Sequence, residues 1–358
     1  MTRTAVITGA GGLVGSELTA ALLPHFDRVL ALTRGEPDLP ALRAAVASAR
    51  PTTDSGELRL ERLDALRADA LTEGSLAAHG ADTVAQVWNV AAELSYDSRR
   101  LRETVDANTA APLRLLELCH PKERFFQVST VGVTGPGQRG LRRVVREEPL
   151  WEIDAVNPYV ASKLFAEHLL KARGEQLGHP VSCLRIGSVL GPRNRATGRR
   201  NKAGYFTLAE MATRALRTGR PLSLDIDPDG TPPLAHVEEL AEACAELARR
   251  AAAGAAVHTH YHLGDQQLSN LRAVEAVNAE LGQEVLRIGA PVTALDRAHA
   301  TVNGDNLAFM DCAFRFDRTV LESHLPAAAA PRVDAPSYAG FLAREMRAGS
   351  VRSPRRAV

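Results

Sequence analysis

The sequence predicts a doubly wound α/β fold, in which a parallel sheet carries helices on both faces and a smaller C-terminal lobe is added. Two observations support this prediction. Short β-rich runs alternate with longer stretches of helical spacing through the first half of the chain, as a parallel sheet with crossover helices requires. A length of 358 residues, 45% of them hydrophobic, is also enough to bury the core of one large α/β domain with a lobe.

The individual elements follow from these periodicities. Runs that predict strands are Thr4–Thr8, Arg28–Thr33, Leu58–Asp64, Val84–Val90, Arg124–Ser129 and Val181–Ile186. Helical spacing is found over Leu13–Leu23, Ala107–Cys119 and Tyr159–Arg173. Because parallel strands are joined by right-handed crossovers, we expect these helices to cover both faces of the sheet.

The alternation weakens after Gly191, where Pro, Gly, Arg and Asn dominate as far as Lys202. A helix is predicted again over Phe206–Thr218 and a strand over His258–Leu263. We therefore expect the main domain to comprise residues 1–190 and 232–263, and the smaller lobe, expected to bind the substrate, to comprise residues 191–231 and 264–348. The segment 349–358, rich in Arg, Ser and Pro, is expected to be a disordered tail.

The charge and composition of the chain limit the kinds of partner that we expect it to bind. The 43 Lys and Arg residues nearly balance the 42 Asp and Glu residues, so no global field attracts nucleic acid or an anionic membrane. Four scattered cysteines fit a reducing cytoplasm, and neither a signal peptide nor an apolar run of about 18 residues is evident. We expect a soluble, cytoplasmic protein that acts on a small molecule, with its oligomeric state open and a homodimer as one option.

A glycine-rich turn follows the first predicted strand and opens the first helix. Its sequence is Thr8-Gly9-Ala10-Gly11-Gly12-Leu13-Val14-Gly15. The glycines at 9, 12 and 15 allow a tight turn, a close approach of backbone to a pyrophosphate, and close packing of helix on strand. The first helical residues, Leu13 and Val14, would face the phosphates with free N–H groups. This placement predicts a dinucleotide site.

The second strand ends at Thr33-Arg34-Gly35, where a fold that selects NAD usually places an acidic residue against the ribose 2′-hydroxyl. Arg34 can instead pair with a 2′-phosphate, which favours NADP, and the alternative is an ordinary solvated arginine. Asp64, at the end of the third strand, either accepts a hydrogen bond from the adenine amino group or caps the next turn.

Tyr159 and Lys163 are placed one turn apart on a predicted helix by Asn157-Pro158-Tyr159-Val160-Ala161-Ser162-Lys163. A free tyrosine has a pKa of about 10, so it serves as an acid or base at neutral pH only with a cation beside it. Lys163 supplies that charge and can also hold the ribose of a nicotinamide. Because YxxxK is a short motif, a chance pair on a surface helix is the alternative.

Together with Phe125-Phe126-Gln127-Val128-Ser129-Thr130, these motifs resemble the extended short-chain dehydrogenases/reductases, a Rossmann family. The resemblance covers about the first 190 residues well. It implies that Thr130 holds the substrate oxygen, with Ser129 as the competing residue. It implies further that Ala91 lies along the cofactor and that Asn108 steadies a water chain to Lys163. A plain hydrogen-bonding role in a helix is the alternative for Asn108.

Arg185–Pro192 and Ala196–Asn201 resemble a stretch of thioester and fatty acyl-CoA reductases. That resemblance implies NADPH-dependent reduction of a carbonyl or of a thioester on CoA or a carrier. Asn89 departs from it, because this branch often has histidine there. A basic loop could meet a CoA or phosphopantetheine phosphate, or be merely solvated: its residues are Arg193, Arg195, Arg199, Arg200 and Lys202.

Three other functions remain open: a ketone or aldehyde reductase of the hydroxysteroid dehydrogenase kind, a nucleotide-sugar epimerase or dehydratase, and a non-catalytic NADP-sensing regulator. No metal site is expected. The acidic run Asp225–Gly230 reaches His236 where a calcium loop needs glutamate. His258, His260 and His262 share one strand face but have no further ligand group nearby in sequence.

Overall fold

The computed structural model describes residues 2–34, 39–48, 56–72, 84–135, 143–152, 154–197, 205–312, 314–327 and 329–351. Its centre is a parallel seven-stranded sheet, ordered β11-β7-β5-β4-β1-β2-β3. The strands are β1 (Thr4–Thr8), β2 (Arg28–Thr33), β3 (Glu57–Arg62), β4 (Val84–Asn89), β5 (Arg124–Thr130), β7 (Val181–Ile186) and β11 (His260–Leu263). The predicted doubly wound fold is therefore confirmed.

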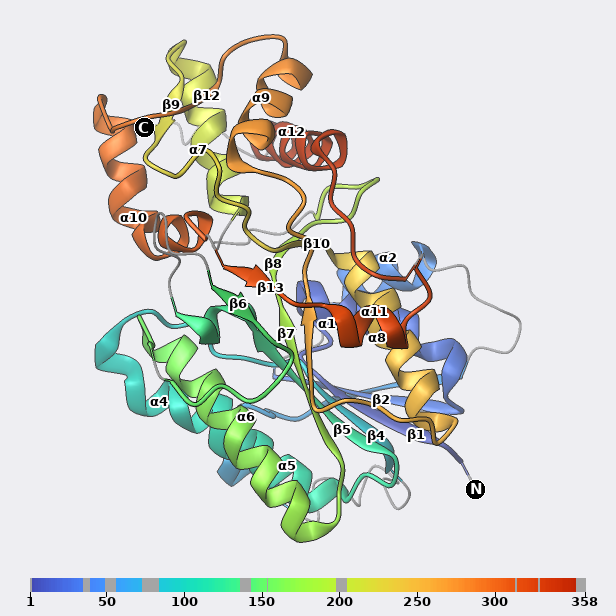
Figure 1. The fold of residues 1–358 in the computed structure, drawn as a ribbon. Coiled ribbons are helices and arrows are strands. Elements are labelled where there is room, and N and C mark those ends of the chain that lie inside the picture. The colour runs from blue at the N-terminus through green and yellow to red at the C-terminus, as the bar shows by residue number, and fades with distance from the viewer. Residues whose placement is uncertain are drawn as a thin grey trace, which may run out of the picture.

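Helices cover both faces of this sheet (Figure 1). On one side, α1 (Leu13–Leu22) packs against α2 (Leu39–Ser48) and α8 (Val237–Ala252). On the other side lie α4 (Leu101–Val105), α5 (Ala111–Cys119) and α6 (Pro158–Leu177). Short turns of 3-10 helix span Leu23–His25, Ala68–Ala70, Ser98–Arg100 and Val131–Thr134, and a π-helical turn spans Asp106–Ala110.

Two neighbouring phenylalanines of β5 show how the sheet fills both layers. Because side chains alternate along a strand, Phe125 and Phe126 point to opposite faces. Phe126 stacks on Trp88 with 4.0 Å between ring centroids, in the layer that contains α1 and α8. Phe125 lies in the other layer, with Leu115 and Leu170. Apolar residues on both faces are what a sheet covered on both sides requires.

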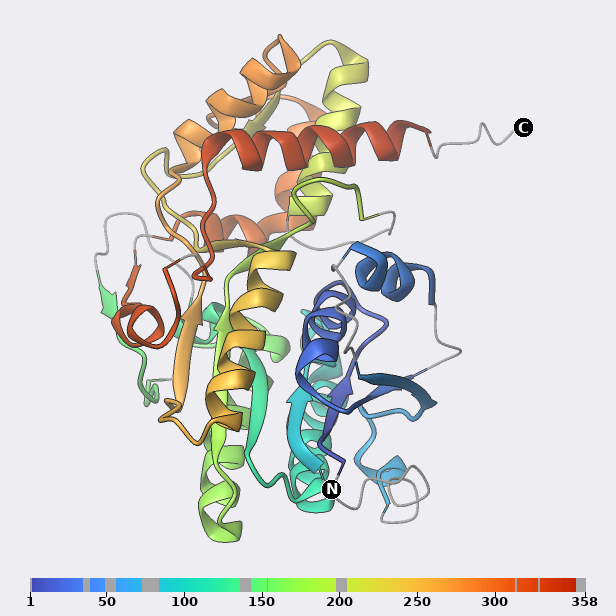
Figure 2. The same cartoon turned by 90° about the vertical axis from the view of Figure 1, so that its right-hand side faces the viewer.

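The C-terminal lobe has its own apolar core beyond the carboxyl ends of the strands (Figure 2). Its elements are α7 (Tyr205–Thr218), β9 (Leu222–Leu224), α9 (Asn270–Leu281), β12 (Leu286–Ile288), α10 (Ala294–Met310) and α12 (Ala335–Val351). The rings of Tyr205 and Tyr338 meet edge to face at 5.5 Å, and those of Phe206 and Phe341 at 5.3 Å. The last helix, red in Figure 2, thus holds α7 in place.

One part of 264–348 departs from the assignment of that range to the lobe. Helix α11 (Thr319–His324) packs on β11, and Leu321 and Leu325 join the core of the sheet. Three short parallel pairs complete the fold: β6 (Val144–Val145) with β13 (Arg315–Phe316), β8 (Ser188–Leu190) with β10 (Leu234–His236), and β9 with β12. The tail predicted over 349–358 was wrong for residues 349–351, which end helix α12, and its remaining residues lie outside the described part of the chain.

Predicted element bounds differ from the observed ones mainly in the helices. The helix expected over Ala107–Cys119 begins earlier, as α4, and reaches α5 through the π-helical turn. The sequence did not predict the lobe helices α9, α10 and α12. No helix in the described part of the chain is long and apolar enough to span a bilayer.

Candidate active site

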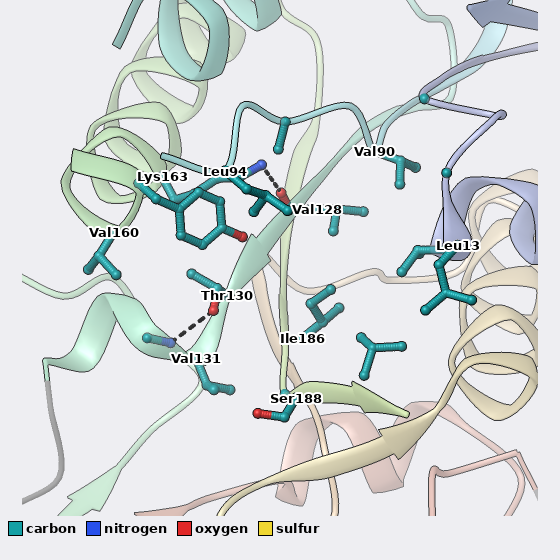
Figure 3. Close-up of a pocket in the computed structure, with 18 of the residues that line it drawn as sticks. Leu13, Val90, Leu94, Val128, Thr130, Val131, Val160, Lys163, Ile186 and Ser188 are labelled. Carbon is teal, nitrogen blue, oxygen red and sulfur yellow. Dashed lines mark hydrogen bonds between the residues drawn. The ribbon is translucent and has the colours of Figure 1, made fainter. Parts of the chain in front are cut away.

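A cavity of about 710 Å³ opens where the strands end (Figure 3). Residues of the lobe also line it. It lies next to the carboxyl ends of the paired strands β1 and β4, where the strand order reverses and ligands of such folds bind. The predicted site residues that line it are Gly9, Gly12, Leu13, Val14, Gly15, Arg34, Asp64, Ala91, Thr130, Tyr159 and Lys163. The remaining predicted residue, Asn108, lies behind the wall.

The glycine turn forms a cradle that larger residues would fill. Gly9 has a φ of +69°, and a Cβ there would lie 2.9 Å from the Ala91 nitrogen. A Cβ on Gly15 would come within 2.0 Å of the Gly9 carbonyl oxygen, whereas one on Gly11 would meet nothing within 4 Å. Helix α1 starts after Gly12 without a side-chain cap. No side chain therefore accepts the first N–H groups of this helix, and these groups could bind an anion such as a pyrophosphate.

Buried polar side chains tie together the strand ends behind this cradle. The Thr8 hydroxyl donates to Asn89 Oδ1 at 2.8 Å and accepts from the Ala91 N–H at 3.0 Å. Asn89 Nδ2 then donates to Gln127 Oε1 at 2.9 Å. Asn89, which departs from the thioester reductase pattern, therefore links β1, β4 and β5. The sequence offered no signal for this role, because it depends on which strands are neighbours.

Helix α6 presents Tyr159 and Lys163 to the cavity. Asn157 caps this helix by accepting the Val160 N–H at 3.0 Å, so Tyr159 lies in its first turn. Lys163 is 1% exposed, and its Nζ donates to the Val128 carbonyl at 2.8 Å, as Figure 3 shows. Burial lowers the pKa of Lys163 to about 8 and raises that of Tyr159 above its usual value. Nζ lies 6.0 Å from the centre of the Tyr159 ring.

The end of β5 separates the two candidate hydroxyls, because successive side chains point to opposite faces. Thr130 lines the cavity, and its Oγ1 accepts the Gly132 N–H at 3.1 Å (Figure 3). Ser129 is fully buried, and its hydroxyl donates to Glu167 Oε1 at 2.5 Å. Among the described contacts, Thr130 is therefore the hydroxyl of this pair that faces the cavity.

Asn108 is fully buried in the π-helical turn and braces the site from behind. Its Oδ1 accepts the Glu93 N–H at 2.8 Å, and its Nδ2 donates to the Glu93 carbonyl and the Ser162 hydroxyl, both at 2.9 Å. These bonds join the segment after β4 to α6, next to Lys163. Both side-chain atoms of Asn108 therefore bond protein groups, in agreement with the hydrogen-bonding alternative.

Arg34 and Asp64 line the cavity just beyond the ends of β2 and β3. The Arg34 side chain is 65% exposed, and its guanidinium lies 3.7 Å from Glu93 Oε2. Asp64 Oδ1 accepts the Leu66 N–H at 3.2 Å, which is the turn-capping role that was left open. The capped carboxylate still lines the cavity.

A buried ion pair lies one helical turn beyond Lys163. Arg185, from β7, grips Glu167 with Nη2 2.7 Å from Oε2, and both side chains are at most 1% exposed. Burial alone would raise the pKa of Glu167, but Arg185 and His260 hold it well below its usual value. Arg185 therefore serves the core in this structure. It does so within the stretch that resembles acyl reductases.

Two histidines of β11 belong to the same network, and a third, His258, precedes that strand. His260 Nε2 lies 3.5 Å from Glu167, and His262 Nε2 lies 3.4 Å from the Arg185 guanidinium. His258 Nε2 lies 2.7 Å from the Glu147 carbonyl oxygen. Across the described residues, no three His, Cys, Asp or Glu side chains are grouped to hold a metal ion.

The lobe supplies a wall of the cavity that the sequence did not predict. Apolar side chains dominate it: Tyr205, Phe206, Leu208, Leu307, Phe309, Met310 and Phe316. Two polar residues of α10, His299 and Asn303, lie among them. Their four-residue spacing is common on any helix, so nothing in the sequence set it apart.

Two residues of the predicted basic loop are held by acids. Arg193 Nε donates to Glu239 Oε1 at 2.7 Å, and Arg195 forms an ion pair with Glu17. The expectation that they meet a phosphate is therefore not supported by their contacts. The other three members, Arg199, Arg200 and Lys202, lie outside the described residues.

A glycine cradle, a Tyr–Lys helix face and a hydroxyl at a neighbouring strand end define the class of this molecule, an extended short-chain dehydrogenase/reductase. The cradle and the uncapped helix fit a nicotinamide dinucleotide. The chain belongs to the NAD dependent epimerase/dehydratase family, whose model matches residues 5–264. The predicted family is thereby confirmed.

Among curated proteins, the chain is similar to a dTDP-4-dehydro-6-deoxy-D-allose reductase of Streptomyces sp.. The two are 28% identical over 311 residues, 82% of this chain and 88% of the relative. Among solved structures, it resembles the terminal R domain of the myxalamid PKS-NRPS pathway, with a TM-score of 0.75, 22% identity, and coverage of 99% and 93%. The NAD complex of UDP-glucuronic acid 4-epimerase from Bacillus cereus aligns with a TM-score of 0.66, 18% identity, and coverage of 96% and 97%.

Proposed function

We propose that this protein is an NADPH-dependent reductase of a carbonyl or of a CoA- or carrier-bound thioester. The observation that carries the proposal is the convergence of Tyr159, Lys163 and Thr130 on the cavity that also contains the glycine cradle. NADPH would supply the hydride to the carbonyl carbon. Tyr159 would give its phenolic proton to the carbonyl oxygen, while the Thr130 hydroxyl shares the charge that develops there. With a thioester the product of this step is a hemithioacetal, whose C–S bond then breaks to give the aldehyde, and its hydroxyl proton leaves with the thiol.

Lys163 is proposed to hold the nicotinamide ribose and to support Tyr159 electrostatically. An ammonium has three N–H donors, and the Val128 carbonyl takes one of them. That bond fixes Nζ beside the strand end at which the sugar would lie. A positive charge near the Tyr159 ring would lower the pKa of the phenol, against the effect of burial.

Selection of NADP is proposed to rest on Arg34, which directly follows β2 and lines the cofactor end of the cavity. A guanidinium pairs well with a phosphate through two parallel N–H bonds. The Arg34 side chain is mostly exposed, and its ion pair with Glu93 spans 3.7 Å, so a 2′-phosphate could displace that pair at small cost.

The lobe wall favours an acyl or carbonyl substrate over a nucleotide sugar. A sugar nucleotide carries a diphosphate, and a binding site for it needs cations or a cluster of N–H groups. The described lobe residues that line the cavity include no Lys or Arg. Arg193 and Arg195, which precede α7 in the same lobe, are paired with Glu239 and Glu17.

The second candidate function is reduction of a nucleotide-linked keto sugar, which the similarity to the Streptomyces allose reductase favours. A turnover screen separates the two. The enzyme is mixed with NADPH or NADH and with acyl-CoA and acyl-carrier thioesters, aldehydes, ketones, and dTDP- and UDP-linked keto sugars. Thiol release coupled to NADPH oxidation would support thioester reduction. Oxidation with aldehydes or ketones alone would leave a plain carbonyl reductase, and oxidation with keto sugars alone would overturn the proposal.

A further inference from the structure

Helix α10 brings two polar side chains into the apolar half of the cavity. His299 and Asn303 lie one turn apart, so they share a helix face, and both line the cavity. They are 2% and 4% exposed. Near the end of the same helix, Phe309 meets the catalytic strand end, because a Cβ on Gly132 would lie 3.3 Å from Phe309 Cζ. Helix α10 therefore runs from the proposed reaction centre into the lobe.

Each of these side chains has a buried nitrogen atom without a hydrogen-bond partner in the protein. These atoms are His299 Nδ1 and Asn303 Nδ2. A buried polar atom without a partner lowers the stability of the folded protein, so buried polar groups normally form hydrogen bonds. Leu307 and Met310, cavity residues further along the same helix, have apolar side chains. Both residues line the cavity, so a rotation of each side chain would turn its nitrogen atom toward a ligand that reaches into the lobe.

His299 is an uncharged partner at neutral pH. Burial lowers its pKa, and the carboxylate of Asp296, one turn earlier, only partly opposes this effect. Asp296 itself is occupied: it accepts N–H groups of Ser223, Val292 and Thr293. A neutral imidazole nitrogen accepts or donates according to its tautomer, and the Asn303 NH₂ donates. A secondary amide, with one C=O and one N–H, matches this pair.

We propose that His299 and Asn303 form a subsite for an amide of the substrate, remote from the carbonyl carbon that is reduced. With a rise of 1.5 Å per residue, Asn303 lies about 9 Å and His299 about 15 Å along the helix axis from Phe309. The substrate is accordingly an extended, largely apolar carbonyl compound with an amide along its length, as in a thioester on a pantetheine arm. This inference rests on the proposed reductase function.

The test compares two thioesters of one acyl group: that of pantetheine, which carries amides, and that of an unbranched alkanethiol of similar length, which has none. The wild-type protein, Asn303→Leu and His299→Phe are assayed with NADPH, and Val302→Ala, an exposed residue of the same helix, is the matched control. Each variant should lose about tenfold in kcat/KM for the pantetheine thioester and little for the alkyl one, as expected for a lost hydrogen bond. The control should resemble the wild-type protein.

Thermal unfolding of the ligand-free proteins gives a second readout. Because Asn303 Nδ2 is unpaired, Asn303→Leu removes an unfavourable buried polar group and should leave the Tm unchanged or raise it. A clear fall in Tm, or an equal loss with both thioesters, would overturn the subsite. Equal turnover of the two thioesters by the wild-type protein would also overturn it. Absence of NADPH oxidation with either thioester and with simple aldehydes would instead refute the reductase function itself.

Discussion

Burial favours the neutral form of both Tyr159 and Lys163. It raises the pKa of the phenol and lowers that of the ammonium to about 8. A protonated phenol is the form that donates a proton, so burial favours the form of Tyr159 that the proposed reduction of a carbonyl needs. In the proposed reaction, Tyr159 is left as a phenolate after it has given up its proton. The positive charge of Lys163 stabilises this phenolate and so partly offsets the effect of burial.

Replacement of Tyr159 by Phe should lower kcat by a factor of about 10² or more, because the proton donor to the carbonyl oxygen is removed. NADPH affinity, measured by fluorescence titration, should stay near that of the wild-type protein. Tyr96→Phe is the matched control, since its ring lines the same cavity 6.4 Å from that of Tyr159. A normal kcat for Tyr159→Phe with a large loss for Tyr96→Phe would transfer the role to Tyr96.

Arg34→Ala should reduce the preference for NADPH over NADH by about 10- to 100-fold in kcat/KM, as loss of a charge-assisted pair predicts. The control is Arg100→Ala, which removes another cation from Glu93 but does not line the cavity. If the two variants keep the wild-type ratio of kcat/KM values, Arg34 takes no part in selecting the cofactor.

The sequence predicts which residues face the site only where a motif fixes their spacing relative to one another. The glycine turn and the YxxxK spacing each do so, and the cavity brings their residues together. Ser129 and Thr130 could not be separated, because the direction of a strand side chain depends on the phase of the pleat. Asn89 and Asn108 bond residues far away in the chain, so the sequence did not show their partners.

At the scale of elements, the glycine turn shows why α1 starts where it does. Gly15 allows the helix to lie directly on the Gly9 carbonyl, and Gly9 turns the chain beneath Ala91. A residue with a Cβ at either place would push the helix away from the strand. The position of the helix N-terminus, and hence of its free N–H groups, depends on these two contacts.

Gly15→Ala should therefore weaken NADPH binding by at least tenfold and lower the Tm, because its Cβ would lie 2.0 Å from a backbone oxygen. Gly11→Ala is the matched control in the same turn, since a Cβ there meets nothing within 4 Å. Isothermal titration with NADPH and thermal unfolding measure the two effects. Equal behaviour of the two variants would contradict the proposed cradle.

Element prediction succeeded where local periodicity decides the structure. The bounds of β1, β2 and β7 match the predicted runs. The π-helical turn at Asp106–Ala110 was missed, because it accommodates contacts that Asn108 makes with Glu93 and Ser162. Such turns are rare and are enriched at functional sites, and their causes are tertiary.

At the scale of the whole molecule, His262 joins three parts of the fold. It lies in β11, its Nε2 faces Arg185 of β7, and its Nδ1 lies 2.8 Å from the Asp317 carbonyl oxygen, just before α11. Burial and the neighbouring Arg185 lower its pKa to about 4. The imidazole is therefore neutral in the folded protein at neutral pH.

This depressed pKa predicts a loss of stability in acid. The unfolded chain binds a proton at His262 near pH 6.5, whereas the folded protein does so only near 4, so the free energy of unfolding falls as the pH drops between these values. The loss attributable to this one site is about 3 kcal/mol at most. His260 and Glu167 titrate nearby, and Glu147, with a pKa raised to about 7, acts in the opposite sense.

The measurement is therefore a difference between two proteins. Denaturant unfolding of the wild-type protein and of His262→Asn, which can still donate to the Asp317 carbonyl, is followed from pH 4.5 to 7.5. The variant should lose less stability than the wild-type protein below pH 6.5, whatever its stability at pH 7.5. Parallel curves would mean that His262 does not contribute to the acid sensitivity.

The lobe is the part of the molecule that the sequence described least. Its helices bury apolar residues against one another, but their spacing does not reveal which helices are neighbours or that α11 returns to the sheet. The place of His299 and Asn303 in the cavity depends on the position of α10 beside the strand ends, which the sequence does not show.

Helix α12 also has a consequence for the order in which the molecule can be assembled. It pairs Tyr338 and Phe341 with Tyr205 and Phe206, although the chain returns to the sheet through α11 in between. During synthesis on the ribosome, α7 emerges long before the helix that covers it. The sheet can acquire its core once α11 has emerged, whereas the lobe, and with it the half of the cavity that the lobe lines, closes only after α12 has followed.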